Sequence, residues 1–214
     1  MERKPVIRKG VPKGDKRQRT RKTLVAAAAE IIAEKGFDRT SIEAVCTRAG
    51  LSRGSFYGNF KSREDLFLAV MDSQWMPIEA DFKLGAPLRT QMRLLGEAVA
   101  AQIKTRRANA AGAAAFQLYI VTHAHMRERM TERNAETYRM MAAGFQKIAP
   151  PGSLPMPADR FARVIDALIT GLVFTSFQTP DLISDADIIA AFEALAGAEP
   201  APNPWPMSRP LTRG

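Results

Sequence analysis

The segment from residue 36 to residue 67, GFDRTSIEAVCTRAGLSRGSFYGNFKSREDLF, contains closely spaced signals for helix ends. Thr40 and Glu43 have the spacing of a capping box, in which a hydroxyl and a carboxylate satisfy backbone N–H groups at a helix start. Gly50 can adopt the positive φ that ends a helix sharply, and Ser52 can cap the next helix. The segment therefore predicts two short helices joined by a tight turn, which is the outline of a helix-turn-helix.

Helices on both sides of this motif are expected to complete a small core. Apolar residues recur at helical spacing across residues 24–32. Ser62 and Asp65 are spaced to cap a helix that follows the motif. Phe56 and Phe60 are four residues apart, share one helix face and can pack inward. These features predict a compact three-helix domain.

The opposite face carries groups suited to DNA. Arg53 has a planar fork of donors that matches the O6 and N7 atoms of guanine. Hydroxyl, aromatic and basic side chains near it can bind phosphates and set the register, as can the backbone N–H groups of a helix N-terminus. The expected DNA contacts are Thr40, Ser41, Arg53, Gly54, Ser55, Tyr57, Asn59, Lys61 and Arg63. Alternatively, the helix-turn-helix shape serves packing alone, as it does in some larger helical proteins.

Positive charge is concentrated at the amino terminus. The net charge is +9, and residues 1–22 hold ten Lys and Arg against Glu2 and Asp15. A basic segment beside a helix-turn-helix is typical of attraction to phosphate or of an arm that enters a neighbouring groove. A solvated tail has the same composition. We expect residues 1–16 to be a basic flexible arm.

At these positions the chain resembles the DNA-binding domain of the tetracycline-repressor (TetR) family of bacterial regulators. The resemblance covers roughly residues 17–72, and the matching positions are Gly36-Phe37, Thr40-Ser41-Ile42, Val45, Ala49-Gly50-Leu51-Ser52, Gly54-Ser55-Phe56-Tyr57, Asn59-Phe60, Ser62-Arg63-Glu64 and Leu66. Two positions depart from the family pattern. Gly58 falls in the recognition helix, where glycine costs about 0.5–1 kcal/mol relative to alanine, and Glu43 would place a carboxylate near phosphate.

The rest of the chain is also predicted to be helical. Few β-branched runs alternate with polar residues, so no sheet is expected. The predicted fold class is all-α with about nine helices, in which residues 17–72 form the helix-turn-helix domain. The resemblance implies that residues 73–198 form a helical ligand-binding and dimerisation domain. Residues 199–214 begin with five prolines in twelve residues and are predicted to be an extended tail.

The last two predicted helices, 158–178 and one that begins at Asp185, carry wide apolar faces. We expect a two-fold dimer interface from Phe161, Ile165, Leu168, Leu172, Ile188, Phe192 and Leu195. The small residues Ala167, Thr170 and Gly171 would permit close approach of a second copy. The alternative is that both helices fill the core of one chain. The resemblance implies a four-helix dimer bundle, and a two-fold dimer would read a palindrome.

Methionine and aromatic residues in the second domain could line an adaptable apolar pocket. Stripes of this kind are more often ordinary core, but the resemblance favours a pocket for a small apolar effector. The candidate ligand-binding residues are Trp75, Met92, Phe116, Tyr119, His123, Met140 and Phe174.

The sequence gives little indication of a metal site, a cofactor, catalysis, a disulfide or a membrane span. His123 and His125 are two apart and do not face each other on a helix, so no metal site is predicted. There is no Gly-rich phosphate loop or nucleophile elbow, and we expect neither a cofactor nor an enzyme. Cys46, the single cysteine, excludes a disulfide within one chain. The longest apolar stretch, 164–177, is interrupted by Asp166 and is shorter than a membrane span.

We therefore expect a cytoplasmic, sequence-specific transcriptional regulator of bacterial type, associated with the nucleoid when it is bound to DNA. In this hypothesis a dimeric repressor leaves a palindromic operator when a small molecule favours another arrangement. The helix from Arg63 to about Met76 would act as the lever between the two domains. Two alternatives stay open: a sequence-tolerant architectural DNA-binding protein with steep salt dependence, and a helical enzyme or scaffold with a structural helix-turn-helix.

Overall fold

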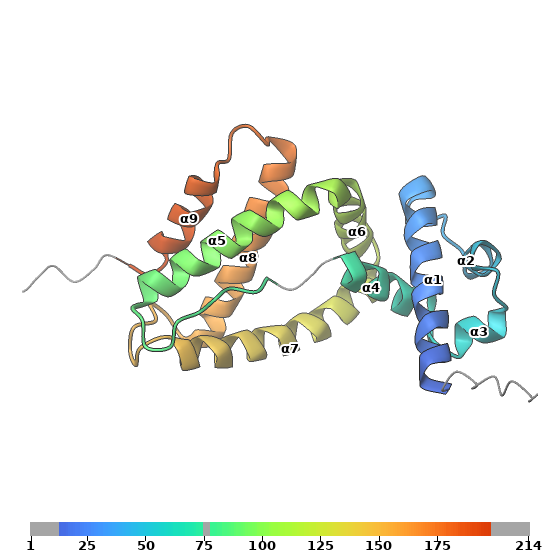
Figure 1. Ribbon diagram of the computed structural model, residues 1–214, viewed down its shortest axis with the longest axis horizontal. Coiled ribbons are helices and arrows are strands. Elements are labelled where there is room, and N and C mark those ends of the chain that lie inside the picture. Colours follow the sequence, from blue (N-terminus) through green and yellow to red (C-terminus); the bar gives the residue numbers. More distant parts are fainter. Residues whose placement is uncertain (1–12, 75–77, 198–214) are drawn as a thin grey trace, which may run out of the picture. The chain divides into compact units, whose positions relative to one another are not determined.

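The computed structural model describes residues 13–74 and 78–197, and these residues are all-helical (Figure 1). Its elements are α1 (Lys13–Lys35), α2 (Ile42–Ala49), α3 (Arg53–Tyr57), α4 (Arg63–Gln74), α5 (Leu88–Arg106), the 3-10 turn η1 (Arg107–Asn109), α6 (Ala110–Thr122), α7 (Ala124–Ile148), α8 (Ala158–Gln178) and α9 (Asp185–Ala194). The all-α class and the expectation of about nine helices are confirmed for the described residues. Because α1 begins at Lys13, the last residues of the predicted arm are helical.

The described residues form two compact units, each with its own hydrophobic core. The head unit contains residues 13–74 and 106–132, and the body unit contains residues 78–105 and 133–197. The segment 106–132, which the sequence analysis grouped with the second domain, therefore packs with the helix-turn-helix. The functional boundary at residues 72 and 73 stays a prediction.

Aromatic side chains join α6 to the head unit. Gly36, with φ 77°, ends α1, and Phe37 turns into the core, where it is 4% exposed. The Phe37 ring centroid lies 5.0 Å from that of Phe67 on α4 and 5.3 Å from that of Phe116 on α6. Tyr119 stacks on Phe37 with 5.4 Å between ring centroids. Burial of these rings helps to hold α6 against the motif.

The start of α2 differs from the sequence prediction. Ser41, not Thr40, is the N-cap, and its Oγ accepts the backbone N–H of Ala44 at 3.1 Å. Thr40 is fully buried, and its hydroxyl donates to the carbonyl of Gly36 at 2.8 Å. The predicted Thr40–Glu43 capping box is therefore wrong, because the Thr40 hydroxyl is used at the end of α1. The predicted turn at Gly50 is confirmed, with φ 63°.

The recognition helix α3 is short. Ser52 caps it as predicted, since its Oγ accepts the N–H of Ser55 at 3.1 Å. The helix ends at Tyr57, and Gly58 is its C-cap with φ −69°. The prediction that Gly58 lies inside this helix is therefore wrong. The chain keeps turning after it, because the N–H of Phe60 bonds to the carbonyl of Phe56 at 2.9 Å.

A break in the backbone separates α6 from α7. Helix α6 ends at Thr122. His123 adopts an extended backbone (φ −118°, ψ 108°), and its ring stacks on Tyr119 with centroids 4.0 Å apart. The helical spacing of apolar residues continues across this break, so periodicity alone could not locate it.

In the body unit, close packing of α5 against α9 depends on a glycine. A Cβ at Gly96 would lie 2.9 Å from the Cα of Ile189, a distance that real Cβ atoms hardly ever show. The carboxamide of buried Gln91 donates to the carbonyl of Ile148 at 3.2 Å and so ties α5 to the end of α7. Ser184 and Asp187 form a capping box at the start of α9.

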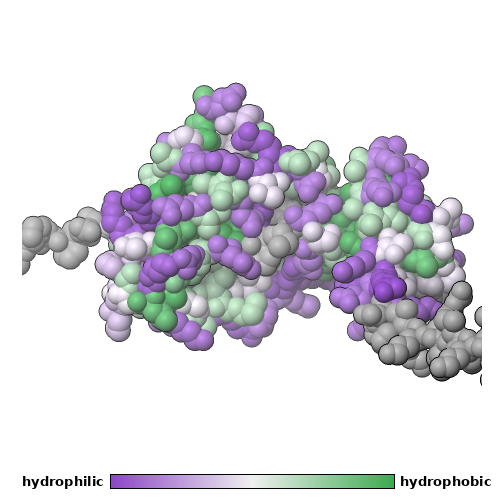
Figure 2. Space-filling view, viewed as in Figure 1, coloured by the Kyte–Doolittle hydropathy of each residue, from purple (hydrophilic) through white to green (hydrophobic). Residues whose placement is uncertain are grey.

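Helix α8 is strongly apolar, although much of it is not buried within one chain. By length and composition it is the one helix among the described residues that could cross a membrane, with a mean hydropathy of 1.3 over its most apolar part, of which 28% is buried within the chain. Apolar side chains, green in Figure 2, also reach the surface of the body unit between polar ones. Most residues of α8 are thus half-buried or exposed within one chain, although Leu168, Ile169, Leu172 and Phe177 pack partly against the body core.

Candidate nucleic-acid interface

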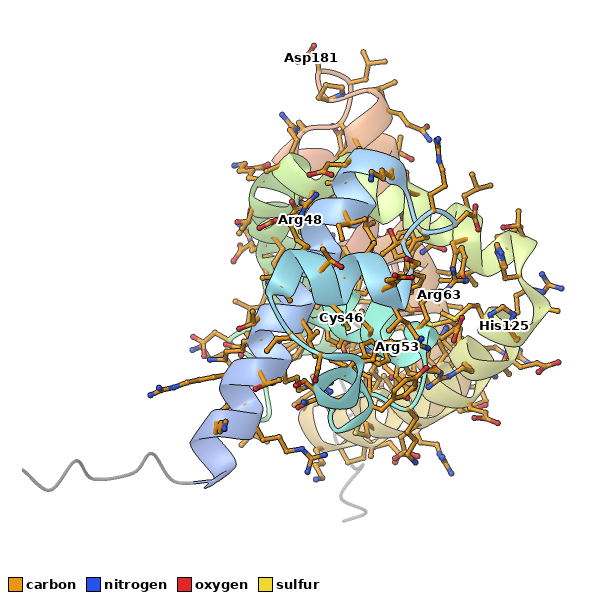
Figure 3. The ribbon with its side chains drawn as sticks, turned by 90° about the vertical axis from the view of Figure 1, so that its right-hand side faces the viewer. Cys46, Arg48, Arg53, Arg63, His125 and Asp181 are labelled. Atoms are coloured by element: carbon orange, nitrogen blue, oxygen red, sulfur yellow. The ribbon has the colours of Figure 1, made fainter. Side chains whose placement is uncertain are left out.

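Helix α3 separates a buried face from an exposed face. Phe56 is fully buried in the head core, whereas Tyr57 is 53% exposed and Arg53 is exposed. The rings of Phe56 and Tyr57 meet edge to face at 5.2 Å between centroids. In Figure 3 the head unit faces the viewer, and Arg53 on α3 is labelled. The arrangement presents a guanidinium and a phenol to solvent from a helix whose other side is fixed in the core.

Further predicted contacts lie on the same unit and are exposed. Ser41 is exposed at the N-terminus of α2, where its hydroxyl oxygen already accepts a backbone N–H. Gly54 is exposed in the first turn of α3, and a Cβ there would meet nothing closer than the Ser52 hydroxyl at 3.6 Å. Lys61 has an exposed side chain, while its backbone N–H donates to Asp65 at 3.0 Å. These groups can approach a phosphate without breaking a structural bond.

Three predicted contacts are engaged inside the protein. Thr40 is buried, so its side chain does not reach a DNA surface in this arrangement. Ser55 is half-buried, and its hydroxyl lies 3.1 Å from that of Ser52. Asn59 turns its side chain inward and donates from Nδ2 to the Ser55 carbonyl at 2.8 Å. For Ser55 and Asn59 the geometry favours support of α3 over contact with bases.

Arg63, also predicted to contact DNA, joins α4 to α6. Its Nη2 donates to the hydroxyl of Tyr119 at 3.0 Å, and its guanidinium lies 5.3 Å from the Phe67 ring centroid. Its Nε is 3.5 Å from a carboxylate oxygen of Glu64. Burial raises the pKa of Tyr119, so this phenol stays protonated at neutral pH. The side chain retains 30% exposure, which leaves part of it open to a phosphate.

Other polar contacts hold the first turn of α4 to α7. Arg129 forms an ion pair with Asp65 and donates to the Ser62 hydroxyl at 3.3 Å. His125, which lies near Arg63 in Figure 3, is 3.6 Å from Glu64. His123 approaches Asp38 at 3.2 Å. The start of α4 is therefore held to α7 by side chains that are far away in the sequence.

Arg48 serves the structure of the head unit. Its guanidinium reaches Glu34 at 2.9 Å and Glu30 at 3.2 Å, both on α1. The hydrogen bond from Arg48 holds the pKa of Glu34 below its usual value. Cys46 on α2 is buried, and burial raises the pKa of its thiol. A buried thiol with a raised pKa is poorly nucleophilic, which fits a packing role.

One functional candidate was missed by the sequence reasoning. In the sequence, Arg21 is one of the ten basic residues of the segment 1–22, and no pattern there gives it a separate role. In the structure its Nη1 donates to the carbonyl of Asn59 at 3.2 Å, and its guanidinium carbon lies 4.3 Å from the Phe60 ring centroid. The contact spans 38 residues, so no local pattern could have revealed it.

The predicted ligand-binding residues are divided between the two units. Trp75 lies outside the described residues. The head unit holds Phe116, Tyr119 and His123, the first two of them buried, and the body unit holds Met92, Met140 and Phe174. Met92 is fully buried, Met140 is 61% exposed and Phe174 is half-buried. Their role in ligand binding stays a prediction.

The predicted dimer residues also divide into two groups. Phe161, Ile165, Ile188 and Phe192 are at most 2% exposed within a single chain. These four build the core of the body unit, as the alternative interpretation held, because α8 and α9 pack on α5 and α7 through them. Leu168, Leu172 and Leu195 are partly buried and remain accessible to a second copy.

Comparison with known proteins shows which protein family the helix-turn-helix region resembles. Residues 24–70 match the family model for bacterial regulatory proteins of the tetR family. The A-factor receptor protein of Streptomyces griseus is 32% identical over 71 residues, which is 33% of this chain and 25% of that protein. The chain thus spans about a quarter of this relative.

Solved structures extend the likeness to 84% of this chain. GusR from Salmonella enterica aligns with a TM-score of 0.61 at 21% identity and covers 84% of this chain and 96% of its own. NalD from Pseudomonas aeruginosa, the secondary repressor of the MexAB-OprM multidrug efflux pump, aligns with a TM-score of 0.55 at 21% identity, over 84% of this chain and 95% of its own. At this identity the likeness concerns the fold.

Proposed function

We propose that this chain, a member of the tetR family of bacterial regulatory proteins, is a dimeric repressor that a small apolar effector releases from a palindromic operator. The observation that carries this proposal is the exposure of Arg53 and Tyr57 on α3 while Phe56, between them in the helix, is fully buried. A helix anchored in this way can enter the major groove and present the same side chains to the bases each time it binds.

The proposed contacts to DNA are of two kinds: some read base edges, and others hold the phosphate backbone and so position the protein. Arg53 has the geometry for a bidentate contact with guanine, the commonest specific contact in major grooves. We expect the phosphate backbone to be held by the exposed side chains of Tyr57, Lys61 and Ser41 and by the exposed part of Arg63. The basic residues of α1 add attraction that falls as salt rises.

A second copy would pack against the exposed side of α8. This side carries Ala167 and Gly171, one turn apart and both exposed, with half-buried Thr170 and Phe174 beside them. A Cβ at Gly171 would meet nothing within 4 Å in one chain. Small residues allow close approach of two helices, and partly exposed Leu168 and Leu172 add apolar area. We propose that two copies associate here and double the DNA contact.

Release by an effector requires a link between the effector and α3. The polar contacts of Arg63, Asp65 and Glu64 with α6 and α7 offer that link, because α7 continues into the body unit. An effector that prefers an arrangement with these contacts altered would shift the population away from DNA. Repression is proposed by analogy with NalD, and effector binding by analogy with a relative named as a receptor.

Selection of bound sequences from random duplex DNA at near-physiological salt tests the proposal. We expect the parent protein to enrich a two-fold symmetric motif, and the Tyr57→Ala variant to lose that enrichment. Salt-sensitive binding without enrichment would favour an architectural DNA-binding protein instead. Absence of any binding would contradict the proposal and favour a structural role for the motif.

A further inference from the structure

The end of α3 needs support from outside the helix. With five residues, α3 is far shorter than helices that persist by their own hydrogen bonds. Its orientation therefore depends on what fixes each end. Ser52 caps the first turn, whereas the last turn runs through Gly58 into residues 59 and 60, whose N–H groups both bond to the carbonyl of Phe56.

Arg21 holds this last turn from α1. Its Nη1 donates to the backbone carbonyl of Asn59 at 3.2 Å. The same guanidinium lies over the ring of Phe60, with 4.3 Å from its carbon to the ring centroid. A hydrogen bond and a cation–π contact from one planar group fix both the position and the angle of residues 59 and 60.

Aromatic contacts connect this turn to the exposed face of α3. The Phe60 ring, 3% exposed, packs against Phe56 at 5.7 Å between centroids. Phe56 in turn meets Tyr57 edge to face at 5.2 Å. Asn59 adds a further restraint, since its Nδ2 donates back to the Ser55 carbonyl. A shift of the turn would therefore move Tyr57 and the helix that carries Arg53.

We propose that Arg21 is a positioning residue for DNA reading: it sets the orientation of α3 through Asn59 and Phe60 instead of acting as one more phosphate contact of the basic segment. The inference rests on the proposed function, in which α3 reads the operator. Lysine could replace the charge and part of the stacking, but it lacks the planar fork, so Arg21→Lys should rescue only in part.

Three variants separate positioning from attraction to phosphate. Arg21→Met removes the guanidinium and keeps an unbranched stem, and Arg21→Lys is the conservative replacement. Arg17→Met is the matched control, because it removes the same charge from the same face of α1 one turn earlier. Each protein is compared with the parent by amide hydrogen exchange without DNA. Binding to the selected duplex and to a scrambled duplex is then measured over a range of salt concentrations.

We expect Arg21→Met to speed exchange of the Asn59 and Phe60 amides about three- to tenfold while α4 amides are unchanged. The preference for the selected over the scrambled duplex should fall by a similar factor, with partial recovery in Arg21→Lys. Arg17→Met should leave both the exchange at residues 59 and 60 and the preference for the selected duplex unchanged, while it weakens binding to the two duplexes equally.

Unchanged exchange at residues 59 and 60 would overturn the inference. A salt slope lower by about 1 with the preference retained would identify Arg21 as a phosphate contact. If the parent enriched no sequence, the proposed function would fail, and the exchange experiment would still show whether Arg21 holds the turn.

Discussion

The hydroxyl of Tyr119 on α6 accepts a hydrogen bond from Nη2 of Arg63, at the start of α4, over 3.0 Å. Tyr119 is 2% exposed and meets Phe67 edge to face, and the Arg63 guanidinium carbon lies 5.3 Å from the Phe67 ring centroid. This bond places a residue from the middle of the chain inside the unit that holds the helix-turn-helix.

Loss of that hydroxyl should weaken the head unit. In Tyr119→Phe, a half-buried guanidinium loses an acceptor, and we expect the free energy of unfolding to fall by about 1–3 kcal/mol. Urea denaturation followed by circular dichroism measures the change. Tyr57→Phe is the control, because it removes the same group from a ring that is 53% exposed and should change stability by less than about 0.5 kcal/mol.

The pH dependence of stability should report on Asp65. Burial alone would raise the pKa of Asp65, but hydrogen bonds from Arg129 and from backbone N–H groups outweigh it and lower the pKa below its usual value. Because the folded pKa is the lower one, this carboxylate stabilises the fold above about pH 4, and the contribution is lost as the pH falls through the folded pKa.

Asp65→Asn should therefore be less stable than the parent at pH 7, with a difference that shrinks toward pH 3. Thermal unfolding across this range measures it. Asp181→Asn, at an exposed loop position visible in Figure 3, should match the parent at every pH. A difference for Asp65→Asn that stayed constant with pH would show that its charge is not the cause.

Arg53 should set specificity at one base position. Arg53→Ala removes an exposed side chain without touching the core, so the fold should be intact. We expect binding to the selected duplex to weaken by about 1–3 kcal/mol and the preference at a single base pair to relax. Competition between duplexes that differ at each position measures this, and equal losses for every sequence would argue against base reading.

Lys61 should contribute attraction without specificity. Its backbone N–H bond to Asp65 survives in Lys61→Ala, so the cap of α4 should persist. Binding should weaken by the same factor for all duplexes, and the slope of log K against log salt should fall by about 1. Titrations at several salt concentrations give the slope, and an unchanged slope would rule out a phosphate contact.

The exposed side of α8 should decide the oligomeric state. Gly171→Arg adds bulk and charge where a Cβ meets nothing in one chain, so the monomer should fold normally and a helix-to-helix interface should be blocked. Sedimentation equilibrium should show a dimer for the parent and a monomer for the variant. Gly144→Arg on α7, where a Cβ also meets open space, is the control and should stay dimeric.

Local patterns in the sequence determined the helices and the motif. The turn at Gly50, the cap at Ser52 and helix α8 agree with prediction, because caps, glycine conformations and apolar spacing act within a few residues. Arg53 and Tyr57 were singled out because a guanidinium and a phenol suit contact with DNA, and both are exposed while Phe56 is buried.

Tertiary structure decided what depends on distant partners. It buried Thr40 against Gly36 and left the cap of α2 to Ser41. It placed α6 and the start of α7 in the head unit, and it gave Arg21 a partner 38 residues away. Each outcome depends on which surfaces meet after the helices form. Apolar spacing identifies a face that must be covered, but only the packed chain determines which segment covers it.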